Sequence, residues 1–271
     1  MYNISMDRVT TPTPAEMTSE EAGHNLTFSR SMVTSGLAEV AKRRMTPTSD
    51  WSGMGRAEHF VQFYESDAFI VNSVAEYLSH GIKAGESCII AATRDHIDEI
   101  ERVIGAFGQD VRAAADSGLY IPLEARSVLS EIMIDGMPYE GSFLKIMAPL
   151  LEKASGNGGR TRIFGELVAV LLSEGNAKAA IKLEAFWNDL REKYPFSLFC
   201  AYPIDGFTGR EAAKYMAGVC TGHSQVIPGE SYTSLTTPDE RLRAIALLQQ
   251  RGKQLEAEIL ELERRIKTKS I

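Results

Sequence analysis

The chain has 271 residues, of which 44% are hydrophobic and 24% are charged, enough apolar material for one well-packed core. Its net charge of −7 excludes a strongly basic surface, and neutralising phosphates requires clustered Lys and Arg, so we expect no direct nucleic-acid partner. No apolar signal core is recognisable, and no apolar run approaches the roughly 20 residues that cross a bilayer. We therefore expect a soluble, cytoplasmic protein without a membrane partner.

The three cysteines support the same compartment. Cys88, Cys200 and Cys220 form no Cys-x-x-Cys pair, and an odd number does not suggest a disulfide framework. Cys88 and Cys200 lie inside apolar runs, where a free cysteine behaves as a small buried hydrophobe. Redox sensing by Cys200 stays open, because it depends on exposure of the thiol.

The first part of the chain predicts a flexible arm over residues 1–56. Ser, Thr, Pro and Met dominate this stretch, so it offers little to bury. A helix over about 26–45 is the alternative, because several apolar residues there fall near one face.

Strand-like and helical patterns alternate from His59 to about residue 217. Strands are predicted at 59–64, 87–92, 119–123, 161–164 and 197–202. Helices are predicted at 68–81, 94–107, 125–134, 140–154, from 167, at 177–193 and at 209–217. Gly81 is predicted to cap the first helix, and Pro149 to kink or interrupt the fourth. Uniformly apolar strands alternating with helices predict a three-layer α/β sandwich with a mostly parallel sheet.

A polar linker over 227–238 leads to a predicted helix over 239–269. Its heptad pattern favours a two-stranded parallel coiled coil, with Ile at the a positions and Leu at the d positions. We expect homodimerisation through Ile245, Leu248, Leu255, Ile259, Leu262 and Ile266. Gly252 at an a position weakens this seam by roughly 1 kcal/mol. The alternative is that the helix packs back on its own domain.

The segment 59–123 resembles the opening of the KaiC-like and RecA-like ATPases. The shared pieces are Gly85-Glu86, the apolar strand after them, Phe107-Gly108 and Gly118-Leu119. An ATPase of this kind would carry G-x-x-x-x-G-K-[ST] between its first strand and helix, whereas this chain has YESDAF at 64–69. Two acids in place of the Gly and Lys residues repel phosphate, so we expect no nucleotide cofactor and no ATP hydrolysis.

A closer resemblance is to the MEDS family, the methanogen/methylotroph sensory domain typified by the dichloromethane-responsive regulator DcmR. It covers residues 57–226 and is carried by HFVQFYE at 59–65, FGE at 164–166, LE at 183–184 with WN at 187–188, LFCAYP at 198–203 and CTGHS at 220–224. The resemblance implies a ligand-binding sensory domain in bacterial signal transduction or transcriptional control. Nothing outside 57–226 reads as a helix-turn-helix or a kinase, so the chain would signal through a protein partner, using its C-terminal helix or N-terminal arm.

Ligands of open α/β sheets bind beyond the carboxyl ends of the strands. The residues that follow the predicted strands supply a mixed polar and aromatic rim. The predicted ligand-binding residues are His59, Tyr64, Glu65, Thr93, Arg94, Glu124, Glu166 and Tyr202, of which His59 instead begins the first strand. For Glu166 a functional role and a structural role at a helix N-terminus are both open.

We predict neither a metal nor an enzymatic activity. Cys220 and His223 have the spacing of half a metal site, but their possible partners His24, His59, His96 and Cys200 are distant in sequence. The chain carries no G-x-S-x-G or H-E-x-x-H motif. The predicted function is therefore a non-catalytic sensor for an unknown small molecule. A ligand-independent adaptor and a residual nucleotide-dependent enzyme are the alternatives.

Overall fold

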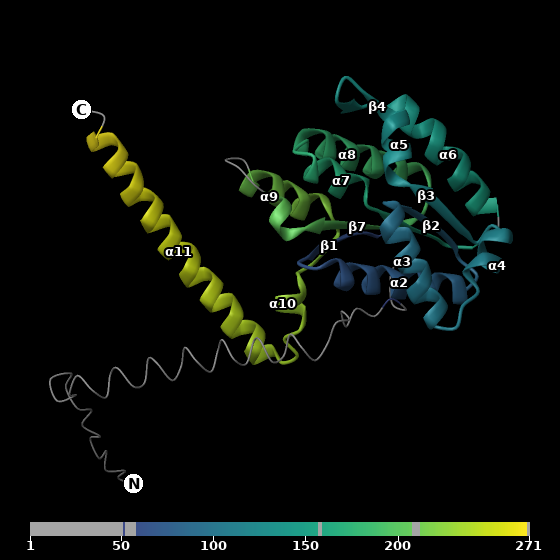
Figure 1. Cartoon of the computed structure of the whole chain (residues 1–271), viewed down its shortest axis with the longest axis horizontal. Helices are drawn as coiled ribbons and strands as arrows, with labels where there is room; N and C mark the ends of the chain where they lie inside the picture. Colours follow the sequence, from purple (N-terminus) through teal and green to yellow (C-terminus); the bar gives the residue numbers. More distant parts are fainter. Residues whose placement is uncertain (1–50, 52–57, 157–158, 208–211, 270–271) are drawn as a thin grey trace, which may run out of the picture. The chain divides into compact units, whose positions relative to one another are not determined.

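A computed structural model of the chain describes residues 51, 58–156, 159–207 and 212–269 (Figure 1). Apart from Trp51, the predicted N-terminal arm lies outside the described residues, as does the alternative helix over 26–45. No helix in the described part of the chain is long and apolar enough to cross a membrane.

The centre of the domain is a six-stranded sheet in which every strand pairing is parallel. The strand order is β3-β2-β6-β7-β1-β8. The bounds are β1 His59–Tyr64, β2 Ser87–Ala92, β3 Tyr120–Glu124, β6 Thr161–Gly165, β7 Ser197–Pro203 and β8 Gln225–Ile227. All five predicted strands are present, and the sequence did not predict β8, a three-residue edge strand.

One face of the sheet is covered by α2 (Asp67–Lys83), α3 (Arg94–Ala106) and α4 (Val111–Asp116). The other face is covered by α5 (Ala125–Ile132), α6 (Glu140–Gly156), α7 (Leu167–Ser173), α8 (Ala177–Lys193) and α9 (Ala212–Gly222). In Figure 1, α2 and α3 lie on one side of the strands and α7 and α8 on the other. Each face has its own core, built from alternate residues of the same strands. The predicted three-layer α/β sandwich is confirmed.

The predicted cap at Gly81 is wrong, and the helix around Pro149 is not interrupted. α2 continues through Gly81 and ends at Lys83, and the residue with a positive φ is Gly85, at 70°. Gly81 is needed for close packing instead, because a Cβ there would lie 2.6 Å from Cys88 Sγ. α6 runs unbroken past Pro149, which is tolerated although proline removes one helical hydrogen bond.

Two short elements also escaped prediction. The predicted helix over 125–134 ends at Ile132, where a hairpin of β4 (Met133–Ile134) and β5 (Met137–Pro138) begins. Its turn places Asp135 and Gly136 at positive φ. Trp51 lies within the range predicted as an arm, yet it is buried against the rings of Phe60 and Phe199.

After β7 come η1 (Ile204–Gly206) and α9, and after β8 come α10 (Glu230–Thr233) and α11 (Pro238–Lys269). The range predicted as a linker therefore contains the last residue of β8 and all of α10. The apolar a and d residues of α11 are exposed, by 40% at Ile245 and up to 66% at Leu248. No described residues cover this seam, so dimerisation through it stays a prediction.

Candidate functional site

The ends of β2 and β6 form a switch point in the topology of the sheet. These neighbouring strands are followed by α3 and α7, which pack on opposite faces. Ligands of open α/β sheets bind at such crevices, outside the carboxyl ends of the strands. Thr93 directly follows β2 and Glu166 directly follows β6, so the structure places two predicted site residues there.

Glu166 organises this rim. Its side chain is buried, and its Oε2 accepts hydrogen bonds from the backbone N–H of Thr93 at 2.8 Å and from the Thr93 hydroxyl at 3.2 Å. His96 Nδ1 lies 2.7 Å from Oε1 of the same carboxylate. The hydrogen bond to Glu166 raises the pKa of His96, and the charges of Glu166, Asp67 and Asp95 add to this against the opposing effect of burial. Glu166 thus has both structural partners and a place at the rim.

Tyr64, at the end of β1, belongs to the same group. Its side chain is largely buried, and burial together with the negative charges of Glu166 and Asp67 raises the pKa of its hydroxyl. Asp67 also lies 3.8 Å from His96 Nε2. The rim therefore combines an acidic pair with a tyrosine, a threonine and a histidine.

Glu65 connects the rim to the segment that leads to α11. Its backbone N–H donates to Glu230 Oε2 at 2.6 Å, and the Ser66 hydroxyl donates to Glu230 Oε1 at 2.7 Å. In return, the backbone N–H of Ser231 donates to Glu65 Oε1 at 3.3 Å. These bonds join the turn between β1 and α2 to α10.

Two predicted residues have local roles at this edge. Arg94 is exposed and lies 4.0 Å from Asp98 within α3. Glu124 caps α5, since its carboxylate accepts hydrogen bonds from the N–H groups of Arg126 and Ser127. A groove of about 210 Å³ opens between the α7–α8 turn and the segment after β7, where its lining includes Leu172, Asn176, Phe207 and Tyr215. None of the predicted ligand-binding residues lines it.

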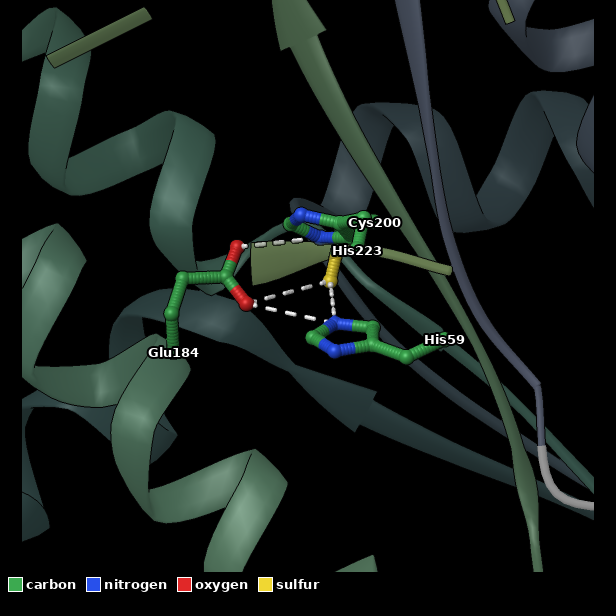
Figure 2. A group of neighbouring side chains, drawn as sticks. All are labelled: His59, Glu184, Cys200 and His223. Atoms are coloured by element: carbon green, nitrogen blue, oxygen red, sulfur yellow. Dashed lines mark hydrogen bonds and ion pairs between the residues drawn. The ribbon is translucent and has the colours of Figure 1, made fainter. Parts of the chain in front are cut away.

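The remaining two predicted residues, His59 and Tyr202, lie in a second, buried cluster on the α8 side of the sheet. Figure 2 shows that the side chains of His59, Glu184, Cys200 and His223 point toward one another. They come from β1, α8, β7 and the residue directly after α9. The Tyr202 hydroxyl donates to Glu184 Oε1 at 2.7 Å.

The distances within the cluster are short. His59 Nε2 lies 3.2 Å from Glu184 Oε2 and 3.3 Å from Cys200 Sγ. Cys200 Sγ lies 3.8 Å from Glu184 Oε2, and His223 Nε2 lies 3.6 Å from Glu184 Oε1. One ligand atom from each of the four side chains can be chosen so that all lie within 4.8 Å of one another.

Burial controls protonation in this cluster. Burial and the neighbouring Glu184 carboxylate raise the pKa of the Cys200 thiol well above its ordinary value. Burial lowers the pKa of His223 against the opposing effect of Glu184. At neutral pH the thiol therefore keeps its proton and the His223 imidazole is neutral, so Cys200 is not an activated thiolate.

Sequence reasoning did not assign His96 or Glu184 to a site. Glu184 carries a signal in retrospect, because it occupies the face of α8 that also holds the buried Ala180 and Trp187. A carboxylate on an apolar stripe requires a polar partner. His96 lies in the first turn of α3, where only the fold shows that Glu166 is adjacent.

The amino-acid sequence of the chain was compared with protein families and with curated proteins. A comparison with curated proteins finds no match to this chain. A family model described as "MEthanogen/methylotroph, DcmR Sensory domain" matches residues 58–217, which include β1 to β7 and the rim residues around Glu166. More than half of the chain lies within this match, and the chain belongs to the MEDS family of sensory domains.

Proposed function

We propose that this chain is a non-catalytic sensor in which a small molecule binds at the rim around Glu166 and changes the presentation of α10 and α11 to a protein partner. The family supports a sensory or signalling role. The observation that carries the proposal is the pair of hydrogen bonds from the β1–α2 turn to Glu230, because they join the rim to the segment before α11.

The rim suits a polar ligand without a phosphate. Asp67 and Glu166 concentrate negative charge at the rim. A phosphate bound there would be repelled by both carboxylates, at a cost of up to about 4 kcal/mol for each close pair near the surface. Glu166 holds Thr93 and His96 in fixed orientations, which lowers the entropy cost of ordering them around a ligand. Tyr64 adds an aromatic surface next to the same carboxylate.

The proposed route to the output is short. Tyr64 and Glu65 are consecutive, so a ligand that moves Tyr64 also moves the N–H that donates to Glu230. α10 is four residues long, and its own backbone hydrogen bonds are local ones within residues 229–235, so the short element can shift as a unit. A ligand changes the output only if it binds the two arrangements of this segment with different affinities.

The exposed apolar seam of α11 is the proposed contact for the output. Homodimerisation through this seam would join two sensory domains through one coiled coil. The same seam favours a second candidate function, a ligand-independent adaptor, since an exposed apolar stripe binds a partner helix whether or not a ligand is present.

Thermal unfolding of the full chain against a metabolite and nucleotide library separates these functions. A ligand present at 100 times its Kd stabilises the folded state by about 2.7 kcal/mol, which raises the Tm by several degrees. The sensor predicts such a shift from a small molecule without a phosphate, lost in Glu166→Gln and retained in Glu99→Gln, a surface control on α3. A shift from ATP instead contradicts the proposal, and no shift from any compound favours the adaptor.

A further inference from the structure

The buried cluster of His59, Glu184, Cys200 and His223 has unusual hydrogen bonding. His223 Nδ1 lies 2.6 Å from the carbonyl oxygen of Val219, so this nitrogen must carry the proton and donate it. His59 Nδ1 lies 2.9 Å from Asn188 Oδ1 and donates in the same way. Both Nε2 atoms face the centre of the cluster, and in a neutral imidazole each of them presents a lone pair there.

Too many acceptors meet at that centre. With both rings neutral, two Nε2 lone pairs, the Cys200 sulfur and a carboxylate face one another. The Tyr202 hydroxyl satisfies one carboxylate oxygen, and the thiol S–H is the one proton that the four side chains themselves place between them. His223 Nε2 is buried without a hydrogen-bond partner among the described residues. A buried acceptor without a donor costs roughly 1–3 kcal/mol, so the arrangement calls for a cation.

We infer that this cluster is a zinc site, in which His59 Nε2, His223 Nε2, Cys200 Sγ and a Glu184 carboxylate oxygen bind one Zn²⁺. Nitrogen, sulfur and carboxylate oxygen are the ligands that zinc takes in proteins. In a tetrahedral site with zinc's usual bond lengths, neighbouring ligand atoms lie about 3.3 to 3.6 Å apart. In the cluster, His59 Nε2, Cys200 Sγ and Glu184 Oε2 lie 3.2 to 3.8 Å from one another. His223 Nε2 lies 3.6 Å from the other carboxylate oxygen, Oε1, and one ligand atom from each of the four side chains lies within 4.8 Å of the others.

Charge balance favours the same ion. Two neutral imidazoles, one thiolate and one carboxylate carry two negative charges, so the site with Zn²⁺ is electrically neutral and can be buried at low cost. Binding releases the thiol proton to solvent as the Zn–S bond forms, because a coordinated thiol is deprotonated outright. The site is closed by four protein ligands, which is the arrangement of structural zinc.

A second set of hydrogen bonds holds the ligands in place. Asn188 and the Val219 carbonyl fix the two imidazoles, and the Tyr202 hydroxyl fixes Glu184. Metal-binding histidines almost always donate their other N–H in this way. The site also lies beside β8, since Ser224 donates to the His59 carbonyl oxygen from both its N–H, at 2.6 Å, and its hydroxyl, at 2.8 Å. Zinc would thus fix the start of β1 to the segment that leads to α10, whether or not a ligand binds at the rim.

Metal analysis of the full chain tests this inference. Protein refolded with excess Zn²⁺ and passed through a desalting column should retain one zinc per chain and unfold several degrees above protein refolded with EDTA. With Co²⁺ in place of Zn²⁺, a thiolate-to-metal charge-transfer band should appear. Cys200→Ser should abolish this band. Cys88→Ser, a buried cysteine outside the cluster, and Cys220→Ser, the cysteine nearest to His223 in sequence, should retain it.

Asn188→Ala is a second test that does not depend on whether Cys200→Ser folds, because it keeps all four proposed ligands. It should weaken zinc binding about 10- to 100-fold, measured by competition with a chromogenic chelator. Wild-type protein that retains no zinc and gives no cobalt–thiolate band would overturn the inference. Loss of the band in Cys88→Ser or Cys220→Ser, or unchanged affinity in both Cys200→Ser and Asn188→Ala, would also overturn it, since the metal would then lie elsewhere.

Discussion

At the scale of single residues, two of the buried carboxylates in this domain are well supplied with hydrogen-bond donors. Glu166 gathers three donors at the rim. On the α2 side, the Arg162 guanidinium pairs with the buried Glu86 carboxylate and stacks 5.0 Å from the Tyr77 ring. Removing one member of such a set leaves its partner uncompensated, which costs more than the bond itself contributes.

The pairing of His96 with Glu166 predicts a pH-dependent stability. The pKa of His96 is raised in the folded protein above its ordinary value of about 6.5. Its contribution is therefore complete below about pH 6.5 and is lost as the pH rises through the folded-state pKa. Urea unfolding should show a larger stability difference between wild type and His96→Gln at low than at high pH. In a Glu166→Gln background the pH dependence should shrink, and a difference that does not change with pH contradicts this assignment.

Packing at Gly81 predicts a strong response to one methyl group. In Gly81→Ala the new Cβ would lie 2.6 Å from Cys88 Sγ and 2.8 Å from Arg162 Cδ, so buried groups must move. We expect a loss of about 1–3 kcal/mol in unfolding free energy. Gly105→Ala in α3 is the matched control, because nothing lies within 4 Å of its Cβ position. It should be neutral or stabilise by up to about 1 kcal/mol, and equal behaviour of the two variants would contradict the packing argument.

At the scale of elements, strand alternation assigns each side chain to one of the two cores. Val61 and Cys200 face the α8 side, whereas Phe60 and Phe199 face the α2 side. β1 and β7 pair with Val61 opposite Cys200, so side chains of the two strands lie in matching rows. A shift of one residue in this register would move Cys200 to the other face and disperse the buried cluster.

The start of α8 gives a prediction at this scale. Asn176 caps the helix, because its Oδ1 accepts a hydrogen bond from the Ala179 N–H at 3.1 Å. Its Nδ2 also donates to the Gly136 carbonyl oxygen at 2.7 Å, which ties α8 to the β4–β5 turn. Asn176→Ala should lower the unfolding free energy by about 1 kcal/mol in chemical denaturation. Asn72→Ala inside α2 is the control, and a cost as large as that of Asn176→Ala would show that capping is not the cause.

The sequence was sufficient for the elements that carry a strong periodic pattern. β2 and β7 read as continuous apolar runs, and α3 as a single stripe, so their existence and the sandwich followed. β8 could not be found, because three residues of which two are exposed carry no pattern and gain their order from pairing with β1. Gly81 was misjudged as a cap because its role is close packing, which local propensity does not show. α6 continues through Pro149, so the proline does not interrupt the helix.

The site was predictable where it depends on strand ends and unpredictable where it depends on tertiary contacts. Thr93 and Glu166 follow strands directly, so strand prediction located them. In the buried cluster, His59 lies more than 120 positions before both Glu184 and His223 in the sequence. Only the packing of α8 and α9 on β1 and β7 brings these residues together. The Cys-x-x-His spacing drew attention to His223, and of its possible distant partners the structure brings His59 and Cys200 into the same cluster.

At the scale of the whole molecule, α11 has no buried residue over 238–267, although it carries a row of large apolar side chains. Its apolar a and d residues would be covered in a parallel dimer. Leu262 at a d position and Leu260 outside the seam are exposed by 57% and 56%, so they form a matched pair. Leu262→Asp should convert a dimer to a monomer in sedimentation equilibrium, and Leu260→Asp should not. Equal behaviour of the two variants, or a monomeric wild type, contradicts the coiled coil.

The proposed sensor requires that the rim around Glu166 communicates with α10 and α11. Hydrogen exchange of the full chain should be measured with and without the compound that gives the largest Tm shift. We expect slower exchange at 64–67 and 93–96 together with a change at 230–233 that is lost in Glu230→Gln. Protection confined to the groove beside Phe207, or protection at the rim with no change at 230–233, would contradict it.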